Sequence, residues 1–269
     1  MTGREDLRAA FSEERAAIMP YLTAGYPTLD GAREVGEAYI AAGADVVEIG
    51  VPFSDPLADG PTIQGTTTQA LRNGANVDYC LDLASGLSRR VPVVFLVYYN
   101  SIFARGAGRF FADAAEAGIS GLVVPDLPVD EAAKMSEVSL ERGVAICPLA
   151  APTTTEARLA TIGAVTSKAG FVYCVSVSGV TGAREALPPG AVALLRRVRS
   201  AVEAPVALGF GIGSEAAAVE AAAEADGVII GSKLMQLVGE GGPEKAGEWL
   251  RGVREAVVGV PRPDAWART

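Results

Sequence analysis

Short apolar runs recur along the chain and alternate with longer alanine-rich segments that carry most of the charged residues. The runs are four to six residues long and rich in Val, Ile and Leu, which is typical of strands buried on both faces. They lie at residues 18–23, 45–49, 93–98, 121–125, 144–148, 170–175, 205–209 and 227–230. The pattern therefore predicts eight buried strands.

The segments between these runs have helical spacing, for example at residues 30–44, 105–120 and 129–143. Each example has a glycine at or near its end, where a helix favours a left-handed residue; these glycines are Gly43, Gly118 and Gly143. Strand then helix, repeated eight times, predicts a parallel sheet that closes on itself. The expected fold is α/β, a (β/α)8 TIM barrel.

The two ends of the chain add little to this barrel. Residues 1–15 contain a helical pattern from Arg4 to Arg15, predicted to be an extra N-terminal helix that covers the barrel floor. Residues 259–269 are predicted to be a loose C-terminal tail. Because no Pro/Gly/Ser-rich linker divides the sequence, we expect residues 1–269 to form a single TIM-barrel domain.

Composition narrows the class of protein. Of the 269 residues 49% are hydrophobic and 20% charged, as in globular proteins. The longest apolar run, 91–99, is far shorter than the roughly 20 residues that span a bilayer. The N-terminus has no apolar core of a secretory signal. We therefore expect a cytoplasmic protein without a membrane segment.

Charge and cysteine usage exclude further classes. The net charge of −9 argues against nucleic acid as a partner, and "RRVR" at 196–199 is the one basic cluster. The three cysteines, Cys80, Cys147 and Cys174, are expected to be reduced and buried.

The chain contains no histidine, which removes the commonest general base and the commonest metal ligand. Neither a metal site nor a Ser-His or Cys-His nucleophile is expected. None of the lysines ends a predicted strand, where a Schiff-base aldolase would need one; they are Lys134, Lys168, Lys233 and Lys245. Any carbon–carbon cleavage must therefore be direct acid–base chemistry.

Four polar residues fall at the carboxyl ends of predicted strands, where TIM barrels carry their chemistry: Glu48, Asp59, Asp126 and Tyr173. Glu48 is either a structural carboxylate satisfied by backbone donors or an acid whose apolar setting raises its pKa for proton transfer near neutrality. Asp59 is either a solvated loop residue or a carboxylate that stays ionised in a polar loop stiffened by three prolines.

Glycines gather after the last three predicted strands, in "SGVTG" at 178–182, "GFGIG" at 209–213 and "GS" at 231–232. Glycine lets backbone N–H groups approach an anion, and barrels commonly bind phosphate at the loops after their seventh and eighth strands. This arrangement predicts a substrate that carries a phosphate group.

Six motifs occur in an order that resembles the tryptophan synthase alpha subunit family, from about residue 12 to 258. They are "PYLTAGYP", "VEIGVPFSDPLADGPTIQ", "DLPVDE", "SGVTG", "GFGI" and "GSKL". The resemblance implies cleavage of indole-3-glycerol phosphate to indole and glyceraldehyde 3-phosphate, with no metal or organic cofactor in this chain. It also implies a beta subunit that carries pyridoxal phosphate, receives the indole through a tunnel and forms an alpha2beta2 complex.

The resemblance further implies roles for individual residues. Glu48 is similar to the family's general acid/base, Asp59 to the carboxylate that accepts the indole N–H, and Tyr173 to the tyrosine beside the scissile bond. The implied indole pocket contains Tyr21, Ile63, Leu96, Val123 and Phe210, and the implied phosphate site contains Gly182, Gly211, Gly231 and Ser232. Thr181 takes the position from which a mobile loop reaches the loop of Asp59.

The implied contacts with the beta subunit are Pro52, Asp55 and Phe103, although Phe103 also fits a simple loop-packing residue. The chain departs from some relatives at Val177 and Ser178, where they have an Arg-Ala pair, and at Tyr21, where they have phenylalanine. Two other functions use the same residues: a stand-alone lyase that releases free indole, and a catalytically idle activator of a beta subunit.

Overall fold

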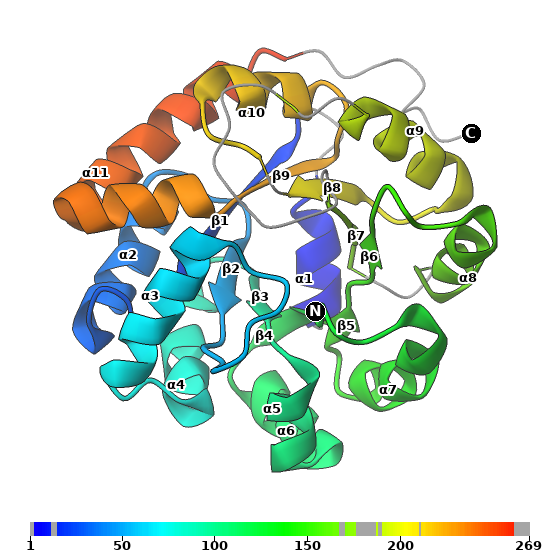
Figure 1. The fold of residues 1–269 in the computed structure, drawn as a ribbon, viewed down its shortest axis with the longest axis horizontal. Helices are drawn as coiled ribbons and strands as arrows, with labels where there is room; N and C mark the ends of the chain where they lie inside the picture. Colours follow the sequence, from blue (N-terminus) through cyan, green and yellow to red (C-terminus); the bar gives the residue numbers. More distant parts are fainter. Residues whose placement is uncertain are drawn as a thin grey trace.

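The computed structural model describes residues 3–11, 15–166, 170–175, 187, 190–209 and 211–260. The strands in these ranges belong to one parallel sheet in the order β5-β4-β3-β2-β1-β9-β8-β7-β6, curled into a ring (Figure 1). They are β1 Ala17–Thr23, β2 Val47–Gly50, β3 Val93–Leu96, β4 Ile119–Val123, β5 Ala145–Ile146, β6 Leu149–Ala150, β7 Val172–Val175, β8 Val206–Gly209 and β9 Gly227–Ile230. The predicted TIM-barrel fold is confirmed.

The fifth predicted strand, 144–148, is observed only as β5, and a second short strand, β6, follows it and closes the ring. β5 pairs with β4, whereas β6 pairs with β7. Pro148 lies between them and has no N–H to donate to a sheet. The Cys147 N–H still donates to the Leu122 carbonyl at 2.8 Å, and the Pro148 carbonyl accepts from the Tyr173 N–H at 2.9 Å. β6 therefore adds a strand to the predicted set without an extra βα unit.

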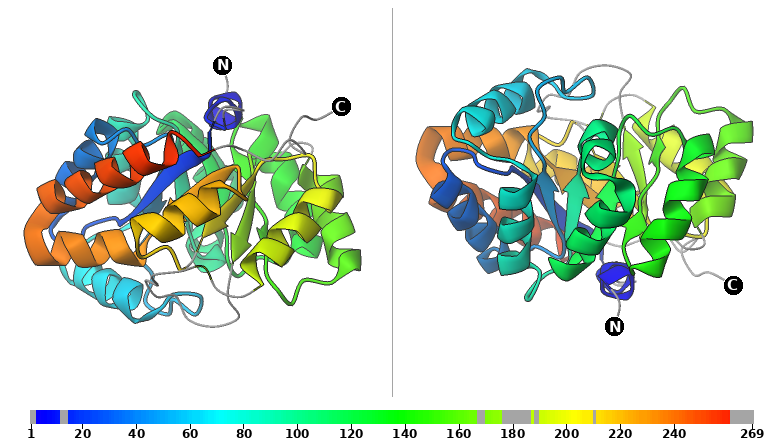
Figure 2. Two further views of the ribbon diagram at one scale, coloured as in Figure 1. Left: turned by 90° about the horizontal axis from the view of Figure 1, so that it is seen from above. Right: turned by 90° about the horizontal axis from the view of Figure 1, so that it is seen from below.

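Helices surround the sheet (Figures 1 and 2). Besides α1 Gly3–Ala9, they are α2 Leu29–Ala41, α3 Pro61–Arg72, α4 Val77–Leu87, α5 Tyr99–Arg105, α6 Ala107–Glu116, α7 Val129–Glu141, α8 Glu156–Thr166, α9 Ala191–Ala201, α10 Glu215–Ala222 and α11 Ser232–Val257. The three helical examples from the sequence correspond to α2, α6 and α7. Gly43, Gly118 and Gly143 follow these helices with φ of 88°, 76° and 72°, as a left-handed C-terminal residue requires.

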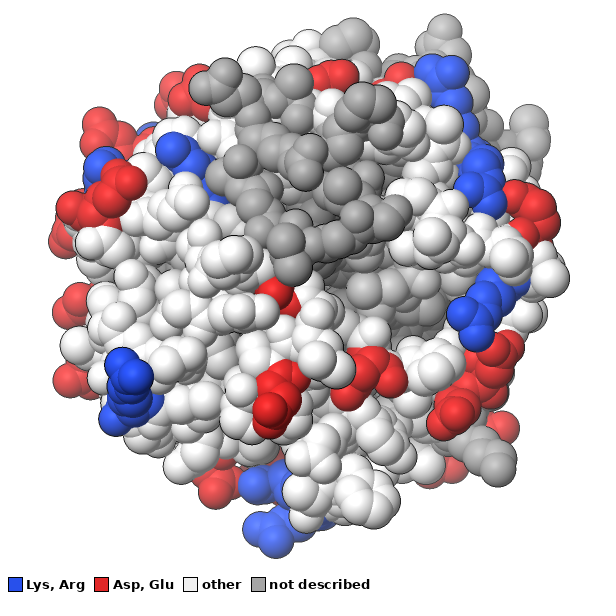
Figure 3. All heavy atoms as spheres, viewed as in Figure 1, with Lys and Arg blue, Asp and Glu red and all other residues white. Residues whose placement is uncertain are grey.

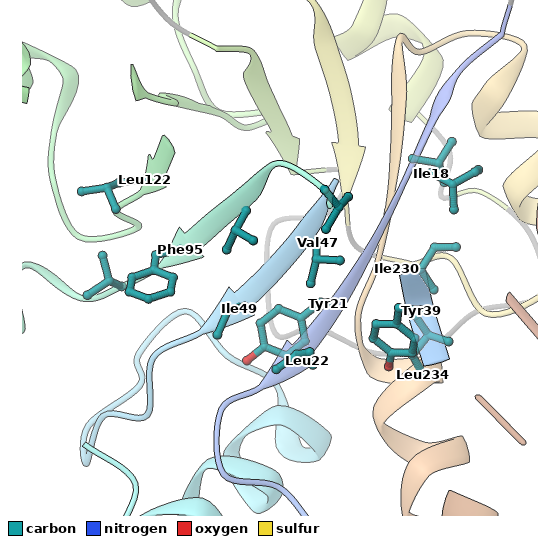
Figure 4. Close-up of a cluster of buried hydrophobic side chains, with 14 of the residues drawn as sticks. Ile18, Tyr21, Leu22, Tyr39, Val47, Ile49, Phe95, Leu122, Ile230 and Leu234 are labelled. Atoms are coloured by element: carbon teal, nitrogen blue, oxygen red, sulfur yellow. The ribbon is translucent and has the colours of Figure 1, made fainter. Parts of the chain in front are cut away.

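Alternate strand residues bury two separate layers. One set points into the ring and includes Met19, Val46 and Val94. The other set packs between sheet and helices, and Figure 4 draws part of it, including Ile18, Val47, Ile49, Phe95 and Leu122. Because the sheet is covered on both faces, apolar residues occur at successive strand positions and not only at every second one.

Helix α1 lies at the amino ends of the strands. The side chain of Leu7 is fully buried in the barrel interior, where it meets Cys147 and Phe171 in one cluster. Both side views place α1 at the opposite end of the barrel from the loop before α3 (Figure 2). The helix is shorter than predicted, because it ends at Ala9. Arg15 instead forms a two-bonded ion pair with Asp45, at 2.7 and 2.6 Å.

The buried residues agree with the predictions for the three cysteines, which are free thiols inside the protein. Burial raises the pKa of Cys147 and of Cys174 to about 12, so neither is a ready nucleophile. Among the helices within the described ranges, we find none with the length and apolarity needed to cross a bilayer.

We expect Tyr39→Phe to stabilise the protein. The Tyr39 ring is fully buried beside Leu234 and Ile230 (Figure 4), and its hydroxyl has no hydrogen-bond partner in the described part of the chain. Removing an unsatisfied buried hydroxyl should add about 1 kcal/mol to the free energy of unfolding. The matched control is Tyr79→Phe, which loses a 2.6 Å bond to the Leu29 carbonyl and should be destabilising. Urea unfolding that shows the same sign for both variants would contradict this interpretation.

Candidate active site

A pocket opens at the carboxyl ends of the strands, where the barrel fold predicts the chemistry. It encloses about 460 Å³ of free space, counting part of its open mouth. Both predicted carboxylic acids, Glu48 and Asp59, line it. The other lining residues are Tyr21, Ile63, Leu96, Tyr173, Gly211, Ile212, Ile229, Gly231 and Ser232.

Glu48 projects into the barrel from β2. It lies two residues after the inward-facing Val46, and only 1% of its surface is exposed. Its Oε1 atom has no hydrogen-bond partner in the described residues. Burial, and then the nearby negative charge of Asp59, raise the pKa of Glu48 to about 8. The carboxyl group is therefore mostly protonated at pH 7 and can act as a proton donor, as the sequence predicted.

Asp59 is more buried than its acidic, proline-rich loop suggested, because only 7% of it is exposed. Burial raises its pKa to about 6, opposed by a hydrogen bond with the Tyr98 hydroxyl. That hydroxyl accepts the Ala58 N–H at 3.0 Å, so its own proton is available to Asp59. The expectation that Asp59 is solvated was wrong, although other residues of its loop are exposed. Asp59 nevertheless stays mostly ionised at pH 7, through one phenol and not through solvent.

Two tyrosine rings fill the space left by glycines at the strand ends. A Cβ atom on Gly50 would collide with the hydroxyl of Tyr21, and a Cβ atom on Gly209 would collide with the ring of Tyr173. Burial raises the pKa of both phenols well above the ordinary value, and the charge of Glu48 contributes to both shifts. Tyr21 and Tyr173 are therefore neutral groups that flank the protonatable acid.

The glycine-rich end of the pocket contains Gly211, Gly231 and Ser232. Gly211 has a φ of 93°, a conformation that other residues rarely adopt. Gly231 immediately precedes α11, a long helix with a kink at 241–242, and Ser232 is its first residue. The unpaired N–H groups at a helix N-terminus attract anions. This end of the pocket is thus suited to a phosphate.

Two predicted positions, Val123 and Asp126, do not join this group in the structure. Val123 is buried in the barrel interior and is not among the lining residues. Asp126 is exposed and accepts the Tyr99 N–H at 2.8 Å, so it caps the start of α5. Thr181 and Gly182 lie outside the described residues, as do Phe210 and positions 261–269 of the predicted tail.

Sequence reasoning missed Tyr98 together with two apolar lining residues, Ile212 and Ile229. Tyr98 lies two residues after the end of β3, and its ring stacks on Phe53 with centroids 5.2 Å apart. The signal was available, because a tyrosine at the carboxyl end of a strand is the same feature that singled out Tyr173. Ile212 and Ile229 carry no such signal, since aliphatic residues at strand ends are common throughout the chain.

The surface around the pocket shows both signs of charge at its edge and no continuous basic area among the described residues (Figure 3). Two large apolar side chains are exposed near it: Leu57, at 88%, and Phe103, at 70%. Phe103 lies on α5 and not in a loop as predicted. Of the other predicted partner contacts, Asp55 is exposed, whereas Pro52 is buried. The exposed part of the loop between β2 and α3 is therefore centred on Asp55 and Leu57.

The fold and the pocket define a class of TIM-barrel proteins that carry paired carboxyl groups beside glycines at the carboxyl ends of the last strands. Residues 7–256 match the family model described as tryptophan synthase alpha chain. The chain belongs to this family.

Individual relatives cover nearly the whole chain. It is 43% identical to the tryptophan synthase alpha chain of Roseiflexus sp. (strain RS-1), over 92% of this chain and 96% of that protein. Among solved structures, tryptophan synthase from Mycobacterium tuberculosis is 36% identical with a TM-score of 0.84, covering 95% of this chain and 96% of that one. The alpha subunit from Legionella pneumophila is 30% identical with a TM-score of 0.86, covering 96% and 98%.

Proposed function

We propose that this chain is the lyase that cleaves indole-3-glycerol phosphate to indole and glyceraldehyde 3-phosphate in tryptophan biosynthesis. One observation carries the proposal: a buried glutamic acid with a pKa of about 8 and an aspartate with a pKa of about 6 line one pocket. Carboxyl groups whose pKa values lie on either side of neutrality divide the acid and base roles between them.

The reaction follows from these protonation states. Protonated Glu48 gives its proton to C3 of the indole ring, and positive charge develops at the ring nitrogen. Ionised Asp59 accepts the N–H hydrogen bond and stabilises that charge. The Glu48 carboxylate then removes the proton of the side-chain hydroxyl next to the ring while the bond from C3 to that carbon breaks. The bonding electrons return to the ring, the aldehyde forms, and Glu48 is protonated again.

The pH profile of kcat/KM should be bell-shaped, because the reaction needs Asp59 ionised and Glu48 protonated. Activity should fall below about pH 6 as Asp59 takes up a proton, and above about pH 8 as Glu48 loses one. Tyr98→Phe removes the hydrogen bond that lowers the pKa of Asp59, so the acidic limb should move to higher pH. Steady-state rates at constant ionic strength would test this, and a flat profile from pH 5 to pH 9 would contradict it.

The phosphate is proposed to bind through backbone N–H groups and not through a lysine. Gly211→Val should weaken binding of indole-propanol phosphate by about five- to tenfold, because a side chain at φ of 93° is strained and obstructs the anion. Lys233→Ala should have less effect, since Lys233 does not line the pocket.

The matched control is Gly190→Val. Gly190 has a φ of 90° and precedes α9, so this variant imposes the same backbone strain outside the pocket. Equilibrium titration should show near-normal affinity for it. A larger loss for Lys233→Ala than for Gly211→Val would reverse the assignment.

Two further parts of the proposal concern cofactor and partner. We propose that the chain acts in the cytoplasm. We also propose that it has no cofactor of its own and that pyridoxal phosphate belongs to a beta subunit, because the described lining of the pocket offers no lysine for a Schiff base. Dialysis against a metal chelator should leave the rate unchanged. The family supports a beta subunit as partner, and we propose an alpha2beta2 assembly, which sedimentation of the mixed subunits would test.

The decisive experiment is cleavage of indole-3-glycerol phosphate by the purified chain, with and without a beta subunit. Release of indole by the chain alone supports the lyase and argues against an idle activator, which would need neither carboxyl group. Full activity without any acceleration by a beta subunit would favour the stand-alone lyase. Absence of cleavage under both conditions would refute the proposed reaction.

A further inference from the structure

Three hydroxyl groups form a chain behind the pocket. The Tyr21 hydroxyl lies 3.3 Å from the Thr23 hydroxyl, which lies 2.8 Å from the Thr66 hydroxyl. The Thr66 hydroxyl donates to the Ile63 carbonyl at 2.9 Å. The three residues that carry these hydroxyl groups are buried.

The carbonyl at the end of the chain determines the direction of its protons. The Ile63 carbonyl can only accept, so the single proton of Thr66 is used there. Thr23 must then donate to Thr66, and Tyr21 must donate to Thr23. All three hydrogen bonds are satisfied only in this direction. The Tyr21 proton is therefore directed away from the pocket, and its oxygen keeps lone pairs that can only accept.

The position of Tyr21 gives this oxygen a role at the site. Tyr21 is paired in register with Glu48 on the neighbouring strand and lines the same pocket. Its ring lies at the carboxyl ends of β1 and β2, with the hydroxyl directed toward β2 (Figure 4). The loop that carries Asp59 begins directly after β2. The Tyr21 oxygen is thus a neutral acceptor on the side of the pocket that holds the charged acceptor.

We propose that Tyr21 is a specificity-determining residue whose hydroxyl, held as a pure acceptor by Thr23 and Thr66, selects indole ligands that carry a hydrogen-bond donor on the six-membered ring. This inference rests on the proposed function, because Asp59 is taken to bind the ring N–H. The six-membered ring then faces the neighbouring acceptor. A hydroxyl substituent can donate a hydrogen bond to the Tyr21 oxygen. A substituent that can only accept is repelled by the lone pairs of that oxygen.

The test compares indole-propanol phosphates with a hydroxyl or a fluorine at each position of the six-membered ring. Fluorine is close in size to a hydroxyl but cannot donate. The wild type should prefer the hydroxyl ligand by about fivefold in Kd at one position at least, the worth of one hydrogen bond. Tyr21→Phe keeps the ring and loses the oxygen, so this ratio should fall to about one. A ratio unchanged in Tyr21→Phe, or no preference at any position in the wild type, would overturn the proposal.

Thr23→Val tests the direction of these hydrogen bonds. The test does not depend on whether Tyr21→Phe folds. It removes the acceptor of the Tyr21 proton, which then becomes free to donate into the pocket. An indole-propanol phosphate with a methoxy group at the selective position can only accept a hydrogen bond there, so it should bind weakly to the wild type and about fivefold better to Thr23→Val. No improvement would refute the one-way chain.

Unsubstituted indole-propanol phosphate distinguishes a failure of the Tyr21 proposal from a failure of the proposed function. If this ligand binds and indole-3-glycerol phosphate is cleaved, but the wild type shows no preference for the hydroxyl ligands, only the role of Tyr21 fails. If the wild type neither binds it nor cleaves indole-3-glycerol phosphate, the proposed function fails as well.

Discussion

Replacing Glu48 with glutamine is expected to lower the rate of indole-3-glycerol phosphate cleavage by at least about 100-fold, the usual contribution of one general acid/base. Glutamine keeps the shape of the side chain but cannot release or regain a proton. Binding of indole-propanol phosphate should change little, because the glycine-lined end of the pocket is untouched. A turnover close to that of the wild type would remove Glu48 from the mechanism.

The same variant should be more stable than the wild type in mildly alkaline solution. The pKa of Glu48 is raised from its ordinary 4.5 to about 8 in the folded protein. Between these values the unfolded chain has released the proton that the folded chain still holds, so the free energy of unfolding falls as pH rises through this window. The penalty is absent below about pH 4.5 and complete above about pH 8.

The size of the effect follows from two opposing contributions. A shift of this extent corresponds to on the order of 5 kcal/mol, and the buried amide of glutamine costs about 1–3 kcal/mol if unsatisfied. We therefore expect a net gain of roughly 3 kcal/mol at pH 8.5 and a net loss of about 1–3 kcal/mol at pH 4.5, where only the cost of the amide remains. Urea unfolding at both pH values measures this. Glu141→Gln, at the exposed end of α7, is the control and should change neither stability nor rate.

A beta subunit is expected to accelerate cleavage by between about 10- and 100-fold, equivalent to 1.4–2.8 kcal/mol of barrier. The physical reason lies in the loop between β2 and α3. Leu57 is exposed at its tip, two residues before Asp59. The intervening Ala58 is hydrogen-bonded to Tyr98, which is also bonded to Asp59 and directly precedes α5, where Phe103 is exposed. A partner that covers Leu57 and Phe103 therefore holds both elements that position the aspartate.

Leu57→Ser and Phe103→Ser should each lose most of this acceleration. The control is Val258→Ser, a residue 59% exposed at the far end of α11, which should keep it. The readout is the ratio of rates with and without a saturating beta subunit, so that any effect on the isolated chain cancels. Equal acceleration of all three variants would place the partner on another face.

The sequence by itself determined the barrel and where its chemistry lies. Eight apolar runs with helical segments between them allow few arrangements other than a closed parallel sheet, because each run must be covered on both faces. An acid inside the run 45–49 marked Glu48, since an apolar strand gives a carboxyl group no solvent. Gly211 and Gly231 marked the end of the pocket where the phosphate is proposed to bind, because glycine lets backbone N–H groups approach an anion.

Only the tertiary structure decided the features that depend on contacts between distant residues. The loop sequence around Asp59 is polar, yet Asp59 is buried and hydrogen-bonded to Tyr98, which lies between β3 and α5. The separation of β5 from β6 depends on which neighbouring strand each of them can reach. The direction of the Tyr21 proton depends on Thr66, 45 positions away in the chain. Local sequence patterns describe the chain over a few residues. Burial and hydrogen-bond direction depend on residues that are distant in the sequence and become neighbours only in the folded protein.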